Sequence, residues 1–463
     1  MEDTEENKNN NKSENNENEE DIDFESMGKQ ELEKHLVVAA KNGRIERVKQ
    51  LLQRGASPDA KEYNRSLFYA SENYNTPLQN AASEGFHELT RVLIENEADI
   101  NAGDRFDVTA LHMAAEGGHV RCVELLLEGG ADCNIGTKYS KYGSYTAFPH
   151  PGGTTPLHLA SVHNHLECVK ALIWHGADYN AVDEYGRTSL YLAAAAAFED
   201  CVHAHLNNAI WKDILSLPVK GTGAGPGQEI GNTPLHECVK HKLVTCIRAL
   251  LKRGSDVNHL NAAGFSPLHL AVKAGEGFSM PVLRELVANG YNTDVNIPDS
   301  QGYTPLHYAC FHENNMQERR PEVARLLIAY GANVDIKISG ADRATLLTQE
   351  LRSPFADLSI LKYIVKTMVV LPSPDTVRMI GPSTVGLHMD LATRRRLMMA
   401  DSQNHFEKVR WFKNECRTPR SLQHLCRYSV RKTITVKRIG QLRTLKIPNT
   451  LKDYLLFNDG DED

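Results

Sequence analysis

The chain has 463 residues, 41% hydrophobic and 24% charged, so it is globular on average and long enough for two or three domains. No apolar run approaches the roughly 18 residues that a membrane span needs, and the acidic, Asn-rich start excludes a secretory signal or transit peptide. The nine scattered cysteines form no Cys-x-x-Cys pair, which argues against a disulfide framework or a closed zinc module. They favour reduced thiols, and hence a cytoplasmic or nuclear protein.

The first part of the chain is acidic although the net charge of the whole is only −7. Residues 1–26 hold eleven acidic residues against Lys8 and Lys12, and they contain almost no apolar side chains. Such a segment cannot bury enough surface to offset the entropy of ordering. We therefore expect residues 1–28 to be a disordered acidic tail.

A four-residue phrase recurs through the middle of the chain and indicates an internal repeat. Copies of this phrase, such as Thr155-Pro-Leu-His, begin at positions 76, 109, 155, 188, 233, 266 and 304. Three of the intervals are 33 residues, and the others are 33 with insertions of 13, 12 and 5. A second phrase, such as Gly176-Ala-Asp-Tyr-Asn, follows some of the copies after an apolar pattern of helical period.

The two phrases in one register resemble the ankyrin repeat. Thr is a good N-cap, Pro is tolerated in the first turn, and Gly supplies a left-handed C-cap, so each repeat predicts two short helices. Degenerate copies near Leu36 and Thr345 bring the count to about nine repeats. The resemblance implies an all-α fold over residues 29–375: an ankyrin-repeat α-solenoid of helix pairs with β-hairpin-like fingers, with insertions near 136–154 and 212–232.

Twenty histidines and a Gly-rich run at 221–227 suggest metal or phosphate sites, but their spacing argues against both. Five histidines share one position of the recurring phrase, so the repeat holds them apart; in ankyrin proteins this His bonds backbone between repeats. These are His112, His158, His236, His269 and His307. The Gly-rich run lacks the Gly-Lys-Ser/Thr ending of a phosphate loop and is expected to be a flexible insertion.

Two His-x-His pairs remain, His163 with His165 and His203 with His205. Two ligands do not make a metal site, so we expect both pairs to be solvated. The chain also lacks a nucleophile elbow, a Walker loop, a kinase signature and a zinc-protease helix. We therefore expect no catalytic residue, no metal and no cofactor.

Beyond residue 380 the repeat ends and two short amphipathic segments follow. Ser421 is placed as the N-cap of the first, and Pro448 opens the second. In each segment apolar residues share one helical face. The first face consists of Leu422, Leu425, Cys426 and Val430, and the second of Leu451, Tyr454 and Leu455.

These segments resemble the two halves of a SOCS box, over about residues 418–457. The first half of that box binds elongin C and the second half contacts cullin. Lys446 stands where the second half of the family motif has its first proline. The resemblance implies elongin binding by Leu422, Leu425, Cys426 and Val430, and cullin binding by Leu445, Ile447, Pro448, Leu451, Tyr454 and Leu455.

Ankyrin repeats ahead of a terminal SOCS box resemble the ankyrin-repeat-and-SOCS-box family. The family implies a non-catalytic substrate receptor of a ubiquitin ligase, which binds elongin C, elongin B and cullin-5 with its RING subunit. The repeats would hold an unidentified protein target for ubiquitination and degradation. In this organisation residues 376–417 form a basic connecting segment and residues 458–463 an acidic C-terminal tail.

Two other functions fit parts of the sequence. The first is an ankyrin adaptor or scaffold in intracellular signalling that recruits no ligase, with the C-terminal helix packed on the solenoid. The second is nucleic-acid or anionic-membrane binding through residues 394–446, which hold fifteen Lys or Arg against three acidic residues. That segment has no recognised nucleic-acid motif, so we expect no nucleic acid and no membrane among the partners.

The target is expected to dock on the concave side of the solenoid, through the first helices and the finger tips. Fingers are the least constrained part of each repeat, because packing and turn geometry fix the scaffold positions. Mixed aromatic and charged side chains there suit a binding surface. The candidate contacts are Arg105, Phe106, Glu184, Tyr185, His259, Leu260 and Gln301.

Overall fold

The computed structural model describes residues 28–61, 75–138, 150–207, 218–219, 230–274, 277–289, 292–310, 321–334 and 336. Within these ranges the chain forms sixteen α-helices and no sheet, apart from one β-bridge between Gly103 and Thr109. The fold is therefore all-α, as predicted. None of these helices is both long enough and apolar enough to cross a membrane.

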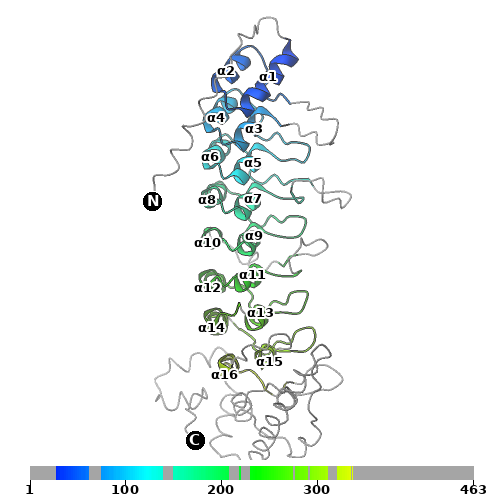
Figure 1. The fold of residues 1–463 in the computed structure, drawn as a ribbon, viewed down its shortest axis with the longest axis vertical. Coiled ribbons are helices and arrows are strands. Elements are labelled where there is room, and N and C mark those ends of the chain that lie inside the picture. Colours follow the sequence, from blue (N-terminus) through cyan, green and yellow to red (C-terminus); the bar gives the residue numbers. More distant parts are fainter. Residues whose placement is uncertain are drawn as a thin grey trace, which may run out of the picture. The chain divides into compact units, whose positions relative to one another are not determined.

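The chain divides into two compact units, residues 1–138 and 139–463. The helices of the first unit are α1 (Lys29–Lys41), α2 (Ile45–Gln53), α3 (Pro77–Ser83), α4 (His87–Glu95), α5 (Ala110–Gly117) and α6 (Val120–Glu128). They form three successive pairs, in which α1, α3 and α5 pack on one another and α2, α4 and α6 form a second layer (Figure 1). The degenerate copy near Leu36 corresponds to the first pair.

The second unit repeats this arrangement. Its helices are α7 (Pro156–Val162), α8 (Leu166–Trp174), α9 (Ser189–Ala195), α10 (Glu199–Asn207), α11 (Pro234–Lys240), α12 (Val244–Lys252), α13 (Pro267–Lys273), α14 (Met280–Asn289), α15 (Pro305–Cys310) and α16 (Pro321–Ala329). Successive first helices, from α7 to α15, pack on one another, and α8, α10, α12 and α14 form the second layer (Figure 1). The ninth copy, expected near Thr345, lies outside the described residues.

The recurring Thr and Pro begin the first helix of several pairs. Thr155 has an extended backbone, and Pro156 occupies the first turn of α7. The backbone N–H of Thr155 donates to Nδ1 of His158 at 3.1 Å, which satisfies one of the donors that a helix start leaves unpaired. The same reciprocal cap recurs at Thr76, Thr109, Thr233 and Ser266.

Glycine ends the second helix of several pairs, as the sequence predicted. Gly176 follows α8 with a φ of 87°, and Gly254 follows α12 with a φ of 89°. A Cβ atom at either position would meet nothing within 4 Å. The left-handed backbone, and not crowding, is therefore why glycine occurs there.

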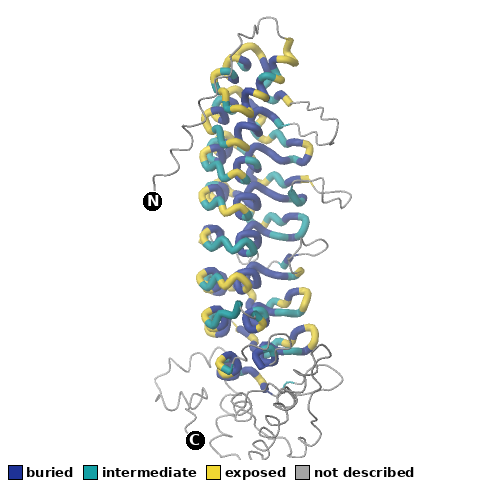
Figure 2. The backbone as a smooth tube through the Cα atoms, in the orientation of Figure 1, coloured by how far each residue is buried: buried dark blue, intermediate teal, exposed yellow. Residues whose placement is uncertain are grey.

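The core of each unit runs between the helices as a series of small and branched apolar side chains. Leu157, Cys168, Val169 and Leu172 are at most 1% exposed. Figure 2 shows that buried residues are concentrated in the first helices, whereas exposed residues gather on the second helices and at the finger tips. The seven cysteines of the described ranges are all buried, and no two of them form a disulfide.

Candidate partner-binding surface

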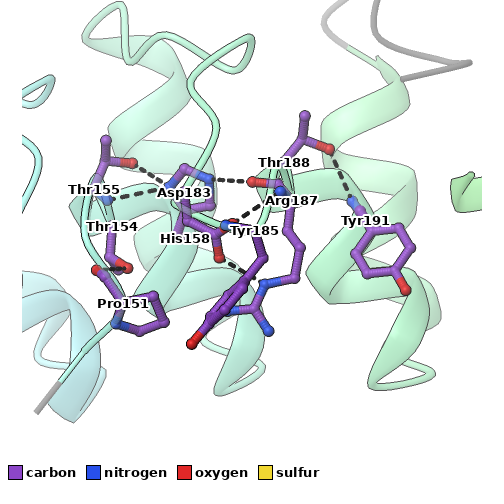
Figure 3. Close-up of polar contacts among 9 residues, drawn as sticks. All are labelled: Pro151, Thr154, Thr155, His158, Asp183, Tyr185, Arg187, Thr188 and Tyr191. Carbon is purple, nitrogen blue, oxygen red and sulfur yellow. Dashed lines mark hydrogen bonds and ion pairs between the residues drawn. The ribbon is translucent and has the colours of Figure 1, made fainter. Parts of the chain in front are cut away.

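Four fingers of the described ranges are turns that an Asp or Asn side chain closes from within. In the finger between α8 and α9, Oδ1 of Asp183 accepts the backbone N–H groups of Tyr185 at 3.0 Å and Arg187 at 2.9 Å (Figure 3). The Arg187 side chain returns to the same carboxylate, with Nε 2.6 Å from Oδ2. Gly186, at a φ of 75°, reverses the chain between them. The backbone of the finger is thus satisfied internally.

The same cap recurs in three other fingers. Asp104 accepts the N–H groups at 106 and 108, Asn261 those at 263 and 265, and Asp299 those at 301 and 303. Gly264 and Gly302 take the left-handed position, and Asp107 takes it in the first unit with a φ of 60°. The residues between the Asp or Asn cap and this position form the tip.

In three repeats the recurring histidine joins the first helix to the next finger. Because Nδ1 of His158 accepts the N–H of Thr155, its Nε2 is free to donate, and it lies 3.1 Å from the carbonyl oxygen of Arg187 (Figure 3). Nε2 of His236 lies 3.0 Å from Phe265 O, and that of His269 lies 3.1 Å from Tyr303 O. Burial lowers the pKa of His158, which favours the neutral ring that this arrangement needs. The structural role predicted for the recurring histidines is confirmed for His158, His236 and His269.

Neighbouring fingers within a unit are also bonded to one another through their backbones. The N–H of Glu184 donates to Gly152 O at 2.7 Å, and that of Ala262 donates to Ile230 O at 2.9 Å. In the first unit the N–H of Lys138 donates to Phe106 O at 2.9 Å. These bonds fix the spacing of the fingers, so their tips present preorganised surfaces.

Six of the seven candidate contact residues reach the surface. Arg105, Leu260 and Gln301 are exposed, and Glu184, Tyr185 and His259 are half-buried. Phe106 is only 8% exposed, so the expectation of an exposed ring at this finger tip was wrong. The guanidinium carbon of Arg105 lies 4.4 Å from the centre of the Phe106 ring and covers it. The ring is thus buried, whereas the Arg105 side chain is exposed.

The positions of the Asp and Asn caps change which of the candidate residues belong to a finger tip. Glu184 and Tyr185 lie between the cap and the left-handed Gly186, and the corresponding positions of the later finger are Ala262 and Ala263. His259 and Leu260 precede the cap Asn261, so they lie on the arm of that finger and not at its tip. In the sequence, the spacing Asp/Asn-x-x-Gly marks the tip.

An aromatic cluster that sequence reasoning missed lies beside the last described fingers. Phe265 and Tyr308 meet edge to face, with centroids 5.9 Å apart. The ammonium group of Lys273 lies 4.0 Å from the Phe265 centroid and 5.6 Å from that of Tyr308. The Tyr308 hydroxyl donates to Asp299 Oδ2 at 2.6 Å. Half-buried aromatic rings of this kind are enriched at protein interfaces.

Trp174 is a second feature that the repeat pattern did not reveal. It is the last residue of α8 and its exposed fraction is 86%. Its helix, α8, belongs to the layer of second helices (Figure 1). Exposed Trp is rare on monomer surfaces and frequent among interface hot spots.

His163 is exposed and His165 is half-buried, in line with the solvated pair that we expected, whereas the pair of His203 and His205 differs from that expectation. His205 is buried, and its Nε2 lies 2.8 Å from Oγ of Ser161. Burial lowers the pKa of His205 to about 3. His163 and His165 stack with centroids 6.1 Å apart. One group of three potential metal ligands is found among the described residues, and it contains His203.

The SOCS-box candidates cannot be placed in the same way. Leu422, Leu425, Cys426 and Val430, and the cullin-contact set from Leu445 to Leu455, lie outside the described residues.

Comparisons with known proteins agree with both modules. A family model of ankyrin repeats (3 copies) matches residues 26–137, 142–214, 157–261, 204–294 and 235–338, together about two thirds of the chain. A SOCS box model matches residues 418–456.

Curated relatives match parts of the repeat region. Inversin of Mus musculus is 30% identical over 158 residues, 34% of this chain and 14% of inversin. Rabankyrin-5 of Homo sapiens is 33% identical over 94 residues, 20% of this chain and 8% of that protein. Transient receptor potential cation channel subfamily A member 1 of Homo sapiens is 32% identical over 104 residues, 22% of this chain and 8% of that protein. The chain thus spans a small part of the length of these relatives.

Proposed function

The chain belongs to the ankyrin repeat and SOCS box proteins, and from this we propose that it is the substrate-recognition subunit of an elongin B/C–cullin-5 ubiquitin ligase. The observation that carries the proposal is the order of the modules: ankyrin repeats to residue 338, then a SOCS box at 418–456. Such a receptor performs no chemistry. It holds the target near the transferred ubiquitin and so raises its effective concentration.

The first half of the box recruits elongin C in this proposal. A short helix would place Leu422 and Cys426 in an apolar groove of elongin C, with Leu425 and Val430 beside them, and elongin B would join elongin C. This is helix-in-groove recognition, in which a few buried apolar anchors contribute most of the binding free energy. Cys426 is a contact residue here and carries no thioester.

The second half of the box selects cullin-5, whose RING subunit brings the ubiquitin-charged conjugating enzyme. Pro448 opens a short helix, and the apolar side chains around it form the cullin contact. They are Leu445, Ile447, Leu451, Tyr454 and Leu455.

The ankyrin units bind the protein target through the finger tips and the aromatic cluster. Two observations support this surface: the fingers are held by their Asp or Asn caps, and their tips differ in chemistry from repeat to repeat. Preorganised loops lose little conformational entropy on binding. Arg105, Glu184, Tyr185 and Gln301 are the tip contacts that we propose, with His259 and Leu260 on the finger arm.

Affinity purification of the tagged full-length chain from cells tests the ligase assignment. The Leu422→Ala, Cys426→Ala double variant removes two anchors, and a matched control, Gln423→Ala with His424→Ala, changes neighbours that lie off the apolar face. Loss of about 2 kcal/mol per anchor weakens elongin binding roughly a thousandfold. The wild type and the control should retain elongins B and C and cullin-5, and the double variant should lose them.

The same purification also distinguishes the adaptor function. If the chain is an adaptor that recruits no ligase, the wild type should capture its target but retain no elongins. Equal elongin capture by the wild type and the double variant would show that the box residues are misassigned. For a ligase receptor, the double variant should accumulate target that is no longer ubiquitinated, which identifies the substrate.

A further inference from the structure

Three side chains with metal-binding atoms meet between two neighbouring repeats of the second unit. Glu199 and His203 lie four residues apart on α10, so they share one face of that helix. Cys246 lies in the first turn of α12, which packs against α10. A carboxylate oxygen, a ring nitrogen and the thiol sulfur all lie within 4.8 Å of one another. Nε2 of His203 is 3.8 Å from Sγ of Cys246.

The group is desolvated on one side and open to solvent on the other. Cys246 is fully buried, whereas Glu199 and His203 are half-buried. Thr245 is exposed, and its hydroxyl contacts the Glu199 carboxylate and lies 3.1 Å from Nε2 of His203. An ion could therefore enter from solvent and keep a water ligand on the exposed side.

The repeat itself supplies a comparison for this thiol. Four second helices carry Cys as their third residue: Cys122, Cys168, Cys201 and Cys246. In the helix before Cys201, the positions that correspond to Glu199 and His203 are Leu166 and Lys170, neither of which suits a metal. We compare each described second helix with the Cys-bearing second helix that follows it. Only the contact between α10 and α12 combines a carboxylate, an imidazole and a thiol in these positions.

We propose that Glu199, His203 and Cys246 bind one zinc-class transition-metal ion, with water as the fourth ligand, and that the ion clips α10 to α12. Mixed oxygen, nitrogen and sulfur donors suit zinc, which is borderline-soft and tetrahedral. On binding, the sulfur–metal bond replaces the S–H bond of Cys246 and the proton passes to solvent. The clip would link the two helices that flank residues 208–243, a range that contains α11 and the insertion near 212–232.

Cobalt(II) titration of the purified full-length chain tests the site, because cobalt–thiolate ligation gives a charge-transfer absorption that histidine or carboxylate ligation does not. The wild type should develop this absorption, saturate it at one equivalent, and lose it when Zn²⁺ is added. His203→Gln, at a half-buried position, should weaken cobalt binding by at least about 100-fold, since even outer partners of a metal site contribute 10- to 100-fold. Cys246→Ala should abolish the absorption.

Cys201→Ala is the matched control, because Cys201 occupies the same helix position one repeat earlier. It should retain the absorption and the wild-type cobalt affinity. The proposal is overturned if the wild type shows no thiolate absorption, if the absorption survives in Cys246→Ala, or if Cys201→Ala loses it equally. If Cys246→Ala fails to fold, Glu199→Gln and His203→Gln decide the question: wild-type cobalt affinity in both would refute the site.

Discussion

The phenol of Tyr191 donates a 2.9 Å hydrogen bond to the carboxylate of Glu237, and both side chains are buried. Tyr191 occupies the histidine position of the recurring phrase in α9, and Glu237 belongs to α11 of the next repeat. Nδ2 of Asn232 also donates to this carboxylate, at 2.8 Å, and Nζ of Lys240 lies 3.8 Å from it. At Tyr191 the first helix is thus joined to the next first helix through a buried phenol–carboxylate bond.

Tyr191→Phe should therefore destabilise the second unit by about 2 kcal/mol, because the variant removes a hydrogen bond to a buried charged group. The urea midpoint of the full-length chain measures this. Glu237→Gln should cost less in the Tyr191→Phe background than alone, because the two residues interact directly. Additive effects of the two substitutions would contradict the pairing.

Acidification should destabilise the repeats through their buried histidines. Burial lowers the pKa of His236 to about 4, that of His307 to about 4 and that of His205 to about 3, against an unfolded value near 6.5. Between these values the unfolded chain binds more protons, so stability is complete above pH 6.5 and decreases as the pH falls. Each such histidine contributes a slope of up to about 1.4 kcal/mol per pH unit. Denaturant unfolding at pH 7.5, 6 and 5 measures the slope.

His236→Gln provides the matched variant for that experiment, since Gln79 occupies the same position in α3. Oε1 of Gln79 accepts the N–H of Thr76 at 2.7 Å, and its Nε2 donates to Val108 O at 2.7 Å. The amide thus makes the bonds of the neutral imidazole and does not titrate. The variant should match the wild type at pH 7.5 and have a slope smaller by about 1.4 kcal/mol per pH unit. An unchanged slope would exclude His236 as a contributor.

Phe106→Ala should reduce stability by about 3 kcal/mol, because it empties a buried site. Arg105→Glu, at an exposed position, should change stability by less than about 0.5 kcal/mol. Thermal unfolding distinguishes the two. Equal melting temperatures for the wild type and Phe106→Ala would show that the ring contributes nothing to the fold.

Target recognition is best tested with variants that leave the buried Phe106 unchanged. Arg105→Glu with Glu184→Arg and Tyr185→Ala should lose the target while elongin capture and the melting temperature stay close to those of the wild type. Wild-type ubiquitination of the target by this triple variant would place recognition elsewhere, and the aromatic cluster around Phe265 would be the next surface to change.

Truncation after residue 444 should separate the two halves of the box. It keeps the proposed elongin helix and removes the cullin set from Leu445 to Leu455, so cullin-5 should be lost while elongins B and C remain. Quantitative pulldown from cells measures both. Equal loss of elongins and cullin would contradict a two-part box.

The sequence by itself determined the helix pairs, and the resemblance to the ankyrin repeat supplied the role of the recurring histidine. Thr155, Pro156 and His158 act within one helical turn, and Gly176 acts through its own φ, so these signals are local and need no knowledge of neighbouring repeats. The 33-residue spacing then determined the order of the pairs. Eight of the expected pairs are found within the described residues.

Only the tertiary structure decided which side chains are buried where repeats meet. The sequence placed Phe106 at a tip and His205 in solvent, yet one is buried and the other bonds Ser161, 44 residues away. His203 likewise approaches Cys246 across 43 residues. Such contacts depend on how successive helices stack, because stacking decides which helix faces exclude water. The repeat period fixes the position of each residue along the chain, but it does not fix the direction in which each side chain points.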